Sequence, residues 1–258
     1  MAILFDMEAR AARRDRAARI GPELFLLERA FEDCLDRLSL VQRRFGNALL
    51  IGCPDPAWPA RLAPFVSALD VRDPGDLFAR AADGERIVED SWEPEHGRYD
   101  LVLAIGTLDT VNDLRRALLT IRWSMGPDGL FLGALAGGNS LPRLRGAMRA
   151  ADAVSGAALP HVHPRIEPSA LAPLLGEADF RNPVVDVDRA AVGYRSFGKL
   201  VSDLRAMGAT NMLAERSRQP LSRAAYAAAA ADFASVAEDG QTVEIFEILH
   251  FACWSPAE

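Results

Sequence analysis

The chain has 258 residues, half of them hydrophobic and a quarter charged, which allows a sizeable buried core and excludes wholesale disorder. The formal net charge of −7 argues against general nucleic-acid binding, because affinity for a polyanion comes from clustered Lys and Arg. No apolar run approaches the ~20 residues that span a bilayer. The cysteines are widely separated and form no CxxC pair, which fits a reduced compartment. We therefore expect a cytoplasmic protein with no integral membrane segment and no nucleic-acid partner.

Residues 1–45 predict a helical extension. Arginines and alanines interleave over residues 6–19, which indicates either a solvated helix or a basic cap that folds over a cofactor or docks an acidic partner. From Leu24 to Val41 apolar residues recur at steps of three and four. This spacing predicts an amphipathic helix with Pro22 at its start and an end near Gly46.

Short apolar runs then alternate with helical stretches. The expected strands are 48–51, 66–69, 86–88, 101–105, 130–135, 184–187 and 244–251, and the expected helices are 114–123, 140–153, 197–207 and 223–237. Apolar strands that alternate with helices predict an α/β domain with a mostly parallel seven-stranded sheet and helices on both faces. We assign it to residues 46–258, with a helical insertion at about 196–237. Ligands of such sheets bind at the carboxyl ends of the strands.

Several segments together resemble a known family. Residues 99–103 and 125–131 are similar to the fourth-strand and fifth-strand signatures of S-adenosylmethionine (SAM)-dependent methyltransferases. A more specific series resembles the complex I assembly factor 5 type, a methyltransferase-like family of mitochondria and alphaproteobacteria. Its segments occur in the family's order at 111–114, 131–133, 141–145, 160–162, 185–188, 203–211 and 246–249. The malonyl-acyl-carrier-protein methyltransferase of biotin synthesis is a more distant resemblance.

This resemblance implies a Rossmann-like methyltransferase fold with SAM as cofactor. It also implies a partner, a subunit of respiratory complex I, which the protein modifies or helps to assemble. The mitochondrial member of the family is associated with hydroxylation of an arginine on its client subunit.

The cofactor loop departs from the family pattern, in which the first strand ends in an acidic residue followed by GxGxG. Only Gly52 survives here, since Leu50 occupies the acidic position and Pro54 and Pro56 occupy the two later glycine positions. Proline fixes φ near −65° and removes an N–H, so two prolines reshape the loop. We therefore expect impaired SAM binding.

The resemblance assigns the remaining cofactor contacts to Gly52, Cys53, Asp70, Asp90, Ser91 and Ile105. Asp70, expected at the end of the second strand, matches the acid that binds the ribose hydroxyls; alternatively it is a turn residue before Pro74. Asp90, with Ser91 after it, matches the position that meets the adenine amino group, or is a simple strand-end residue. Cys53 reads as a buried structural thiol.

After the fourth strand the family commonly has a His-Trp pair, where this chain has Asp109-Thr110 followed by Asn112. Asp109 and Asn112 are the catalytic candidates. His161 and His163 have no carboxylate or cysteine at a recognised metal spacing, so no metal site is predicted.

Three hypotheses follow from these observations. The protein is a SAM-dependent transferase or hydroxylase that acts on an arginine of a complex I subunit. Alternatively, it is a pseudoenzyme that no longer binds SAM and assembles its client by binding alone. The third hypothesis is a small-molecule or carrier-protein O-methyltransferase.

Overall fold

The computed structural model describes residues 3–257, which form one seven-stranded sheet in the order β3-β2-β1-β4-β5-β7-β6. The strands are β1 (Phe45–Ile51), β2 (Val66–Asp73), β3 (Glu85–Arg86), β4 (Tyr99–Ile105), β5 (Met125–Ala136), β6 (Arg181–Tyr194) and β7 (Thr242–Trp254). The strands β1 to β5 pair in parallel, whereas β7 runs antiparallel to both of its neighbours. The predicted α/β class and mostly parallel sheet are confirmed.

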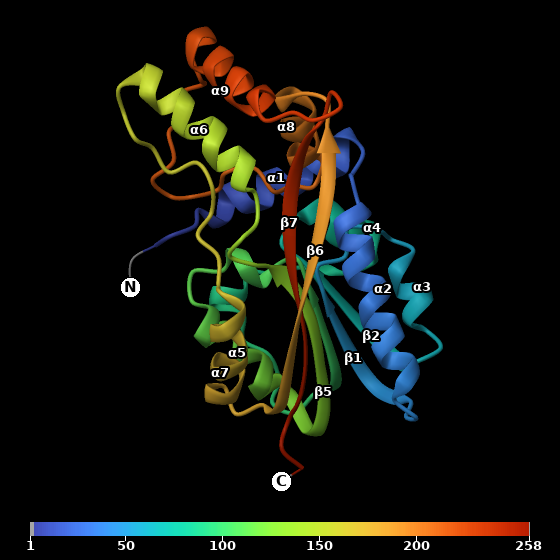
Figure 1. Ribbon diagram of the computed structural model, residues 1–258. Helices are drawn as coiled ribbons and strands as arrows, with labels where there is room; N and C mark the ends of the chain where they lie inside the picture. The colour runs from blue at the N-terminus through green and yellow to red at the C-terminus, as the bar shows by residue number, and fades with distance from the viewer. Residues whose placement is uncertain (1–2, 258) are drawn as a thin grey trace.

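Helices cover both faces of the sheet because alternate side chains of each inner strand point to opposite faces. Leu49 and Ile51 of β1 belong to a core beneath α5 (Leu114–Ser124) and α7 (Pro168–Glu177). Leu50 belongs to a second core beneath α2 (Phe25–Leu40) and α3 (Trp58–Leu62). Figure 1 shows these helices on either side of the strands.

A third helical layer stands above the carboxyl ends of the parallel strands (Figure 1). It contains α6 (Pro142–Ser155), α8 (Phe197–Ala206) and α9 (Arg223–Ser235), which pack around Phe197, Phe233 and Phe246. The ends of β6 and β7 reach this layer because they continue to pair beyond the last residue of β5. We call this layer the cap.

The helix α1 (Met7–Ile20) crosses the carboxyl ends of the strands and packs between α4 (Asp76–Ala81) and α8 (Figure 1). Two glycines allow this close approach. A Cβ on Gly75 would lie 2.7 Å from Cβ of Arg14, and one on Gly208 would lie 3.3 Å from Cα of Arg14. The solvated-helix interpretation is wrong for Arg10 and Arg14, which are 3% and 6% exposed.

Some predicted boundaries were wrong. The strand β2 runs to Asp73, four residues beyond its predicted end, and β3 is only the pair Glu85–Arg86. Both differences have one cause: polar residues extend or replace the apolar run where a parallel neighbour supplies the backbone hydrogen bonds. The helix α7 was not predicted. The division at residue 45 stays a prediction.

Candidate functional site

The loop after β1 begins at Gly52, whose backbone has φ +88° and whose N–H donates to the Arg72 carbonyl at 2.8 Å. A Cβ at Gly52 would lie 2.3 Å from the carbonyl oxygen of Ile105, the last residue of β4. The glycine is therefore required by contact between the protein's own strands. Pro54, two residues after Gly52, is buried, and Leu50 is fully buried in the core.

The carboxylate at the end of β2 belongs to Asp73, which sequence reasoning missed. Asp70 lies inside β2, opposite Leu49, so its predicted strand-end position was wrong. Its carboxylate accepts from the Tyr99 hydroxyl at 2.7 Å and pairs with Arg98 at 2.8 Å. Asp73 instead stands beside the glycine loop and is fully buried.

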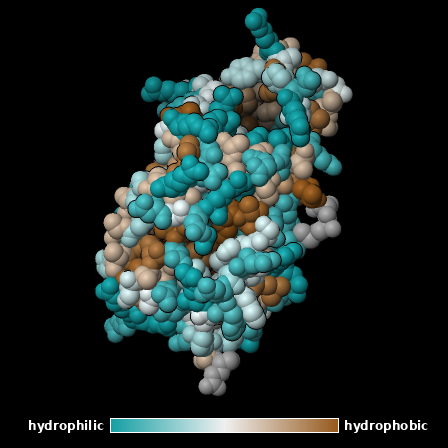
Figure 2. Space-filling model, turned by 180° about the vertical axis from the view of Figure 1, so that it is seen from behind, coloured by the Kyte–Doolittle hydropathy of each residue, from teal (hydrophilic) through white to brown (hydrophobic). Residues whose placement is uncertain are grey.

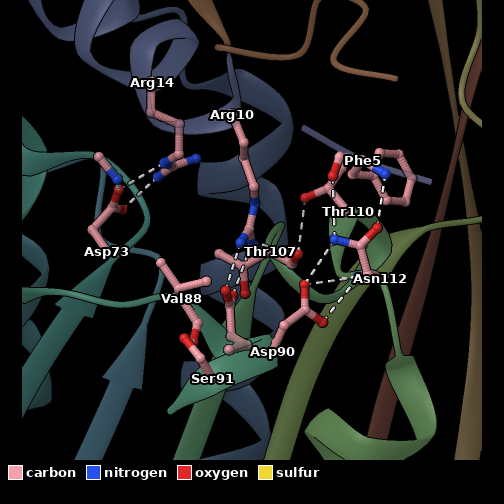
Figure 3. Close-up of polar contacts among 12 residues, drawn as sticks. Phe5, Arg10, Arg14, Asp73, Val88, Asp90, Ser91, Thr107, Thr110 and Asn112 are labelled. Carbon is pink, nitrogen blue, oxygen red and sulfur yellow. Dashed lines mark hydrogen bonds and ion pairs between the residues drawn. The ribbon is translucent and has the colours of Figure 1, made fainter. Parts of the chain in front are cut away.

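Both oxygens of Asp73 are fully engaged within the chain (Figure 3). Its Oδ1 accepts from Arg14 Nε at 2.7 Å and from the Gly75 N–H at 2.8 Å. Its Oδ2 accepts from Arg14 Nη2 at 2.5 Å and from the Cys53 N–H at 2.9 Å. A carboxylate has about four acceptor positions, so none is left for a ribose hydroxyl.

A second arginine of α1 reaches the next strand end in the same way. Arg10 donates through Nη1 and Nη2 to the two oxygens of Glu89 at 2.5 and 2.8 Å, and through Nη2 to the Thr107 carbonyl at 2.8 Å. Glu89 begins the short helix η1 (Glu89–Ser91) and is 2% exposed. Burial acts to lower the pKa of Arg10, but the carboxylates around it, Glu89 above all, raise this pKa by more. The Arg10 guanidinium therefore keeps its charge.

Asp90, the predicted adenine contact, anchors the N-terminal segment (Figure 3). Its oxygens accept from the backbone N–H groups of Asn112 and Asp113 and from Nδ2 of Asn112 at 3.0 to 3.1 Å. Asn112 Oδ1 in turn accepts from the N–H groups of Leu4 and Phe5, both at 2.8 Å. Ser91 Oγ lies 3.4 Å from the Val88 carbonyl. The candidates Asp90 and Asn112 are thus close together, and both hold the chain that leads into α1.

Asp109 lies on the short helix η2 (Leu108–Thr110), and its Oδ2 pairs with Nη1 of Arg165 at 2.5 Å, so it does not share the partners of Asn112. Both side chains are less than 10% exposed and line a cavity of about 120 Å³. Arg14 and Glu247 add charge to its wall, and the rest is mostly apolar: Leu26, Leu27, Ala30, Leu204, Met207, Phe246 and Ile248. This cavity lies between the ends of β4, β5 and β7 and the cap.

Two further titratable candidates, Cys53 and His163, are buried and neutral. Burial raises the pKa of the Cys53 thiol to about 12, and the nearby Asp73 carboxylate acts in the same direction. A thiol in that state is not a nucleophile at neutral pH. Burial, assisted by Arg165, lowers the pKa of His163 to about 4, and its Nε2 accepts from the Met212 N–H at 3.0 Å. His161 pairs with Asp152. Among residues 3–257 no group of three or more His, Cys, Asp or Glu side chains is arranged to hold a metal ion.

These residues do not fit SAM in the arrangement that the family pattern describes. The strand-end carboxylate is saturated, the glycine loop is replaced, and two guanidinium groups occupy the strand ends. The sequence carried one signal for this arrangement: Arg10 and Arg14 are four residues apart and therefore share a helix face. Nothing in their spacing could assign Asp73 and Glu89 as their partners.

Comparisons with known proteins agree with the fold. A family model described as a methyltransferase domain matches residues 25–183. The chain belongs to the methyltransferase-domain family. It is 30% identical over 273 residues to arginine-hydroxylase NDUFAF5, mitochondrial, of Mus musculus, with 97% of this chain and 77% of that protein covered. A malonyl-[acyl-carrier protein] O-methyltransferase of Xylella fastidiosa is 32% identical over 158 residues, which cover 61% of this chain and 52% of that one.

Solved structures share the fold at low sequence identity. The YcgJ protein of Bacillus subtilis is 12% identical with a TM-score of 0.57, and the match covers 87% of this chain and 99% of that one. The N-methyltransferase NodS of Bradyrhizobium japonicum, solved with S-adenosylhomocysteine, is 16% identical with a TM-score of 0.50 over 96% and 99% of the chains. No helix within residues 3–257 is long and apolar enough to cross a membrane. The Mus musculus relative is named as mitochondrial, so a cytoplasmic location stays a prediction.

Proposed function

We propose that this protein is an assembly factor that binds a subunit of respiratory complex I and does not use SAM in the ordinary site. One observation carries the second half of this proposal. The carboxylate at the end of β2 that would bind a ribose, Asp73, is saturated by Arg14 and two backbone N–H groups. The family membership and the long match to the NDUFAF5 relatives support the first half.

The arginines of α1 close the site by replacing a ligand with part of the chain. Displacing Arg14 would leave the buried Asp73 carboxylate without its countercharge, which typically costs about 3–5 kcal/mol. SAM would have to repay this cost from its own contacts, and the Pro54 loop offers it fewer backbone N–H groups than a glycine loop. The fold then serves as a rigid body that presents the cap and its cavity to a client.

Titration calorimetry with SAM and with S-adenosylhomocysteine tests the proposal, with NodS titrated under the same conditions as a positive control. We expect heat from NodS and none from this protein up to millimolar ligand. Micromolar binding by this protein would refute the proposal that it does not use SAM in the ordinary site. It would also favour the carrier-protein O-methyltransferase hypothesis or an active transferase, since both require the cofactor. Affinity capture from its own cells should recover complex I subunits, and their absence would refute the assembly role.

A second candidate is arginine hydroxylation, the activity named for the NDUFAF5 relatives. The pair Asp109–Arg165 supports it, because a carboxylate in the cavity already holds a guanidinium group at 2.5 Å. A client arginine that displaced Arg165 would meet the same acceptor. To test this candidate, the protein with its captured client is incubated with dioxygen and a two-electron reductant. Mass spectrometry then measures the mass of the client. A gain of one oxygen atom on an arginine that is lost in Asp109→Asn would support it, and an unchanged mass would exclude it.

A further inference from the structure

The cap contains a groove that the cofactor site does not use. It lies between α6, α8, the start of α9 and the connecting segments 160–165 and 209–222, and its volume is about 400 Å³. Apolar or aromatic side chains form most of its wall, among them Leu144, Met148, Phe197, Val201, Leu221 and Tyr226. Figure 2 shows this end of the molecule hollowed, with hydrophobic surface inside and a hydrophilic rim. We call this feature the cap groove.

The charges at the cap groove are all of one sign. The chain has 36 acidic and 29 basic residues, yet no Asp or Glu lines the groove, whereas Arg165 and Arg205 do. The carboxylates of the flanking elements are already engaged: Asp152 with His161, Asp203 with Lys199 and Asp109 with Arg165. Asp109 compensates the charge of Arg165, which leaves Arg205 as the lining guanidinium without an ion-pair partner among residues 3–257.

One lining guanidinium, Arg205, and a second one that contacts the lining residue Thr210, Arg16, lie at the groove. Arg16 Nη2 donates to Oγ1 of Thr210, a lining residue, at 2.7 Å, and Arg205 lines the groove and is exposed. Neither arginine forms an ion pair within residues 3–257, and Nε of Arg16 is buried without a hydrogen-bond partner. Burial and the neighbouring Arg205 lower the pKa of Arg16, which agrees with an uncompensated pair of like charges. A carboxylate placed here would make charge-assisted hydrogen bonds.

We propose that the cap groove binds an apolar segment of the client protein that carries an acidic residue, with its carboxylate at Arg16 and Arg205. This inference rests on the proposed function, because it names the surface that recognises the client. Apolar client side chains gain by leaving water against the groove wall. The groove shares Leu141, Arg165 and Leu204 with the inner cavity, so a bound segment lies beside Asp109.

The charge preference is tested with three fluorescein-labelled peptides that share the same leucines and carry glutamate, glutamine or lysine at the remaining positions. Fluorescence anisotropy with the full chain should rank the glutamate peptide first and the lysine peptide last, with about tenfold between glutamate and glutamine. Equal binding of the glutamate and lysine peptides would overturn the proposal. No binding of any peptide up to millimolar concentration would also overturn it.

Substitutions at exposed positions of the cap groove test whether the peptides bind there. Exposed positions are chosen because their substitution keeps the fold intact. Arg205→Glu should weaken the glutamate peptide about tenfold and the glutamine peptide by no more than about twofold. The matched control Arg115→Glu, on α5 away from the cap, should change neither. Leu221→Asp, at a rim position that is 38% exposed, should weaken both peptides while thermal unfolding stays unchanged.

The same variants separate this inference from the proposed function. If the wild-type protein captures complex I subunits and Arg205→Glu and Leu221→Asp capture them equally well, the assembly role stands and the cap groove is refuted as its binding surface. If the wild-type protein captures none while the peptides bind as described, the assembly role fails and the groove remains an acidic-peptide site.

Discussion

Replacing Arg14 with methionine should cost the protein a large part of its stability. The substitution keeps the volume and helix propensity of the side chain but removes the countercharge of Asp73, a residue with no exposed surface. Two of the four hydrogen bonds to the carboxylate, from Cys53 and Gly75, would remain. Arg14 also lies over the Phe78 ring, with Cζ 5.0 Å from the ring centroid.

The expected magnitude follows from these contacts. Removing one partner of a buried ion pair costs about 3–5 kcal/mol, and losing a cation–π contact costs about 0.5–1 kcal/mol. The sum, about 5 kcal/mol, is a large fraction of the ~5–15 kcal/mol that a folded domain typically has. For a chain of this length it corresponds to a fall in Tm of about 10–20 °C.

Urea unfolding followed by tryptophan fluorescence measures the loss in the free energy of unfolding. Arg115→Met is the matched control, because Arg115 is 60% exposed and lies 3.5 Å from Glu177, and it should change stability by less than about 0.5 kcal/mol. The double variant Arg14→Met/Asp73→Asn should recover part of the loss by removing the unpaired charge. A loss for Arg14→Met as small as the control's would show that α1 is not held by this pair, and the account of a closed cofactor site would fail.

Three further predictions concern single residues. Gly52→Ala should lower the free energy of unfolding in urea by about 3 kcal/mol or more, because its Cβ would meet the Ile105 carbonyl. The control Gly240→Ala, also at positive φ but in open space, should cost only about 1–2 kcal/mol. Equal losses for the two variants would contradict the packing argument. Burial lowers the pKa of His163 to about 4 in the folded protein, so the unfolded chain binds a proton at a higher pH than the folded one does. The free energy of unfolding should therefore fall by up to about 3 kcal/mol as pH falls from about 6.5 to about 4. In His163→Gln this share of the pH dependence should vanish, and identical pH profiles for the two proteins would contradict it. Burial raises the pKa of Cys53 and Cys34 to about 12, so a thiol reagent should modify the native protein at pH 7 far more slowly than the urea-unfolded chain, and fast native labelling would refute their burial.

The amino-acid sequence by itself determined the class of fold. Apolar runs such as 101–105 are buried on both faces and could only be inner strands of a covered sheet, and the predicted helices from Phe197 and Arg223 begin at those residues. These features depend on local periodicity and on residues near one another in the chain, which a sequence displays directly. The loss of the glycine loop could be seen in the same way, since Pro54 and Pro56 restrict the backbone wherever they occur.

The site depended on contacts that local patterns do not encode. Asp73 is paired with Arg14, 59 residues away, and Glu89 with Arg10, 79 residues away. A segment of interleaved arginines and alanines has the same local preference for helix whether its arginines face water or carboxylates, so the sequence left both interpretations of residues 6–19 open. Only the tertiary structure, which lays α1 across the strand ends, decided between them, because the desolvation of a buried guanidinium is offset only where a partner carboxylate is already in place.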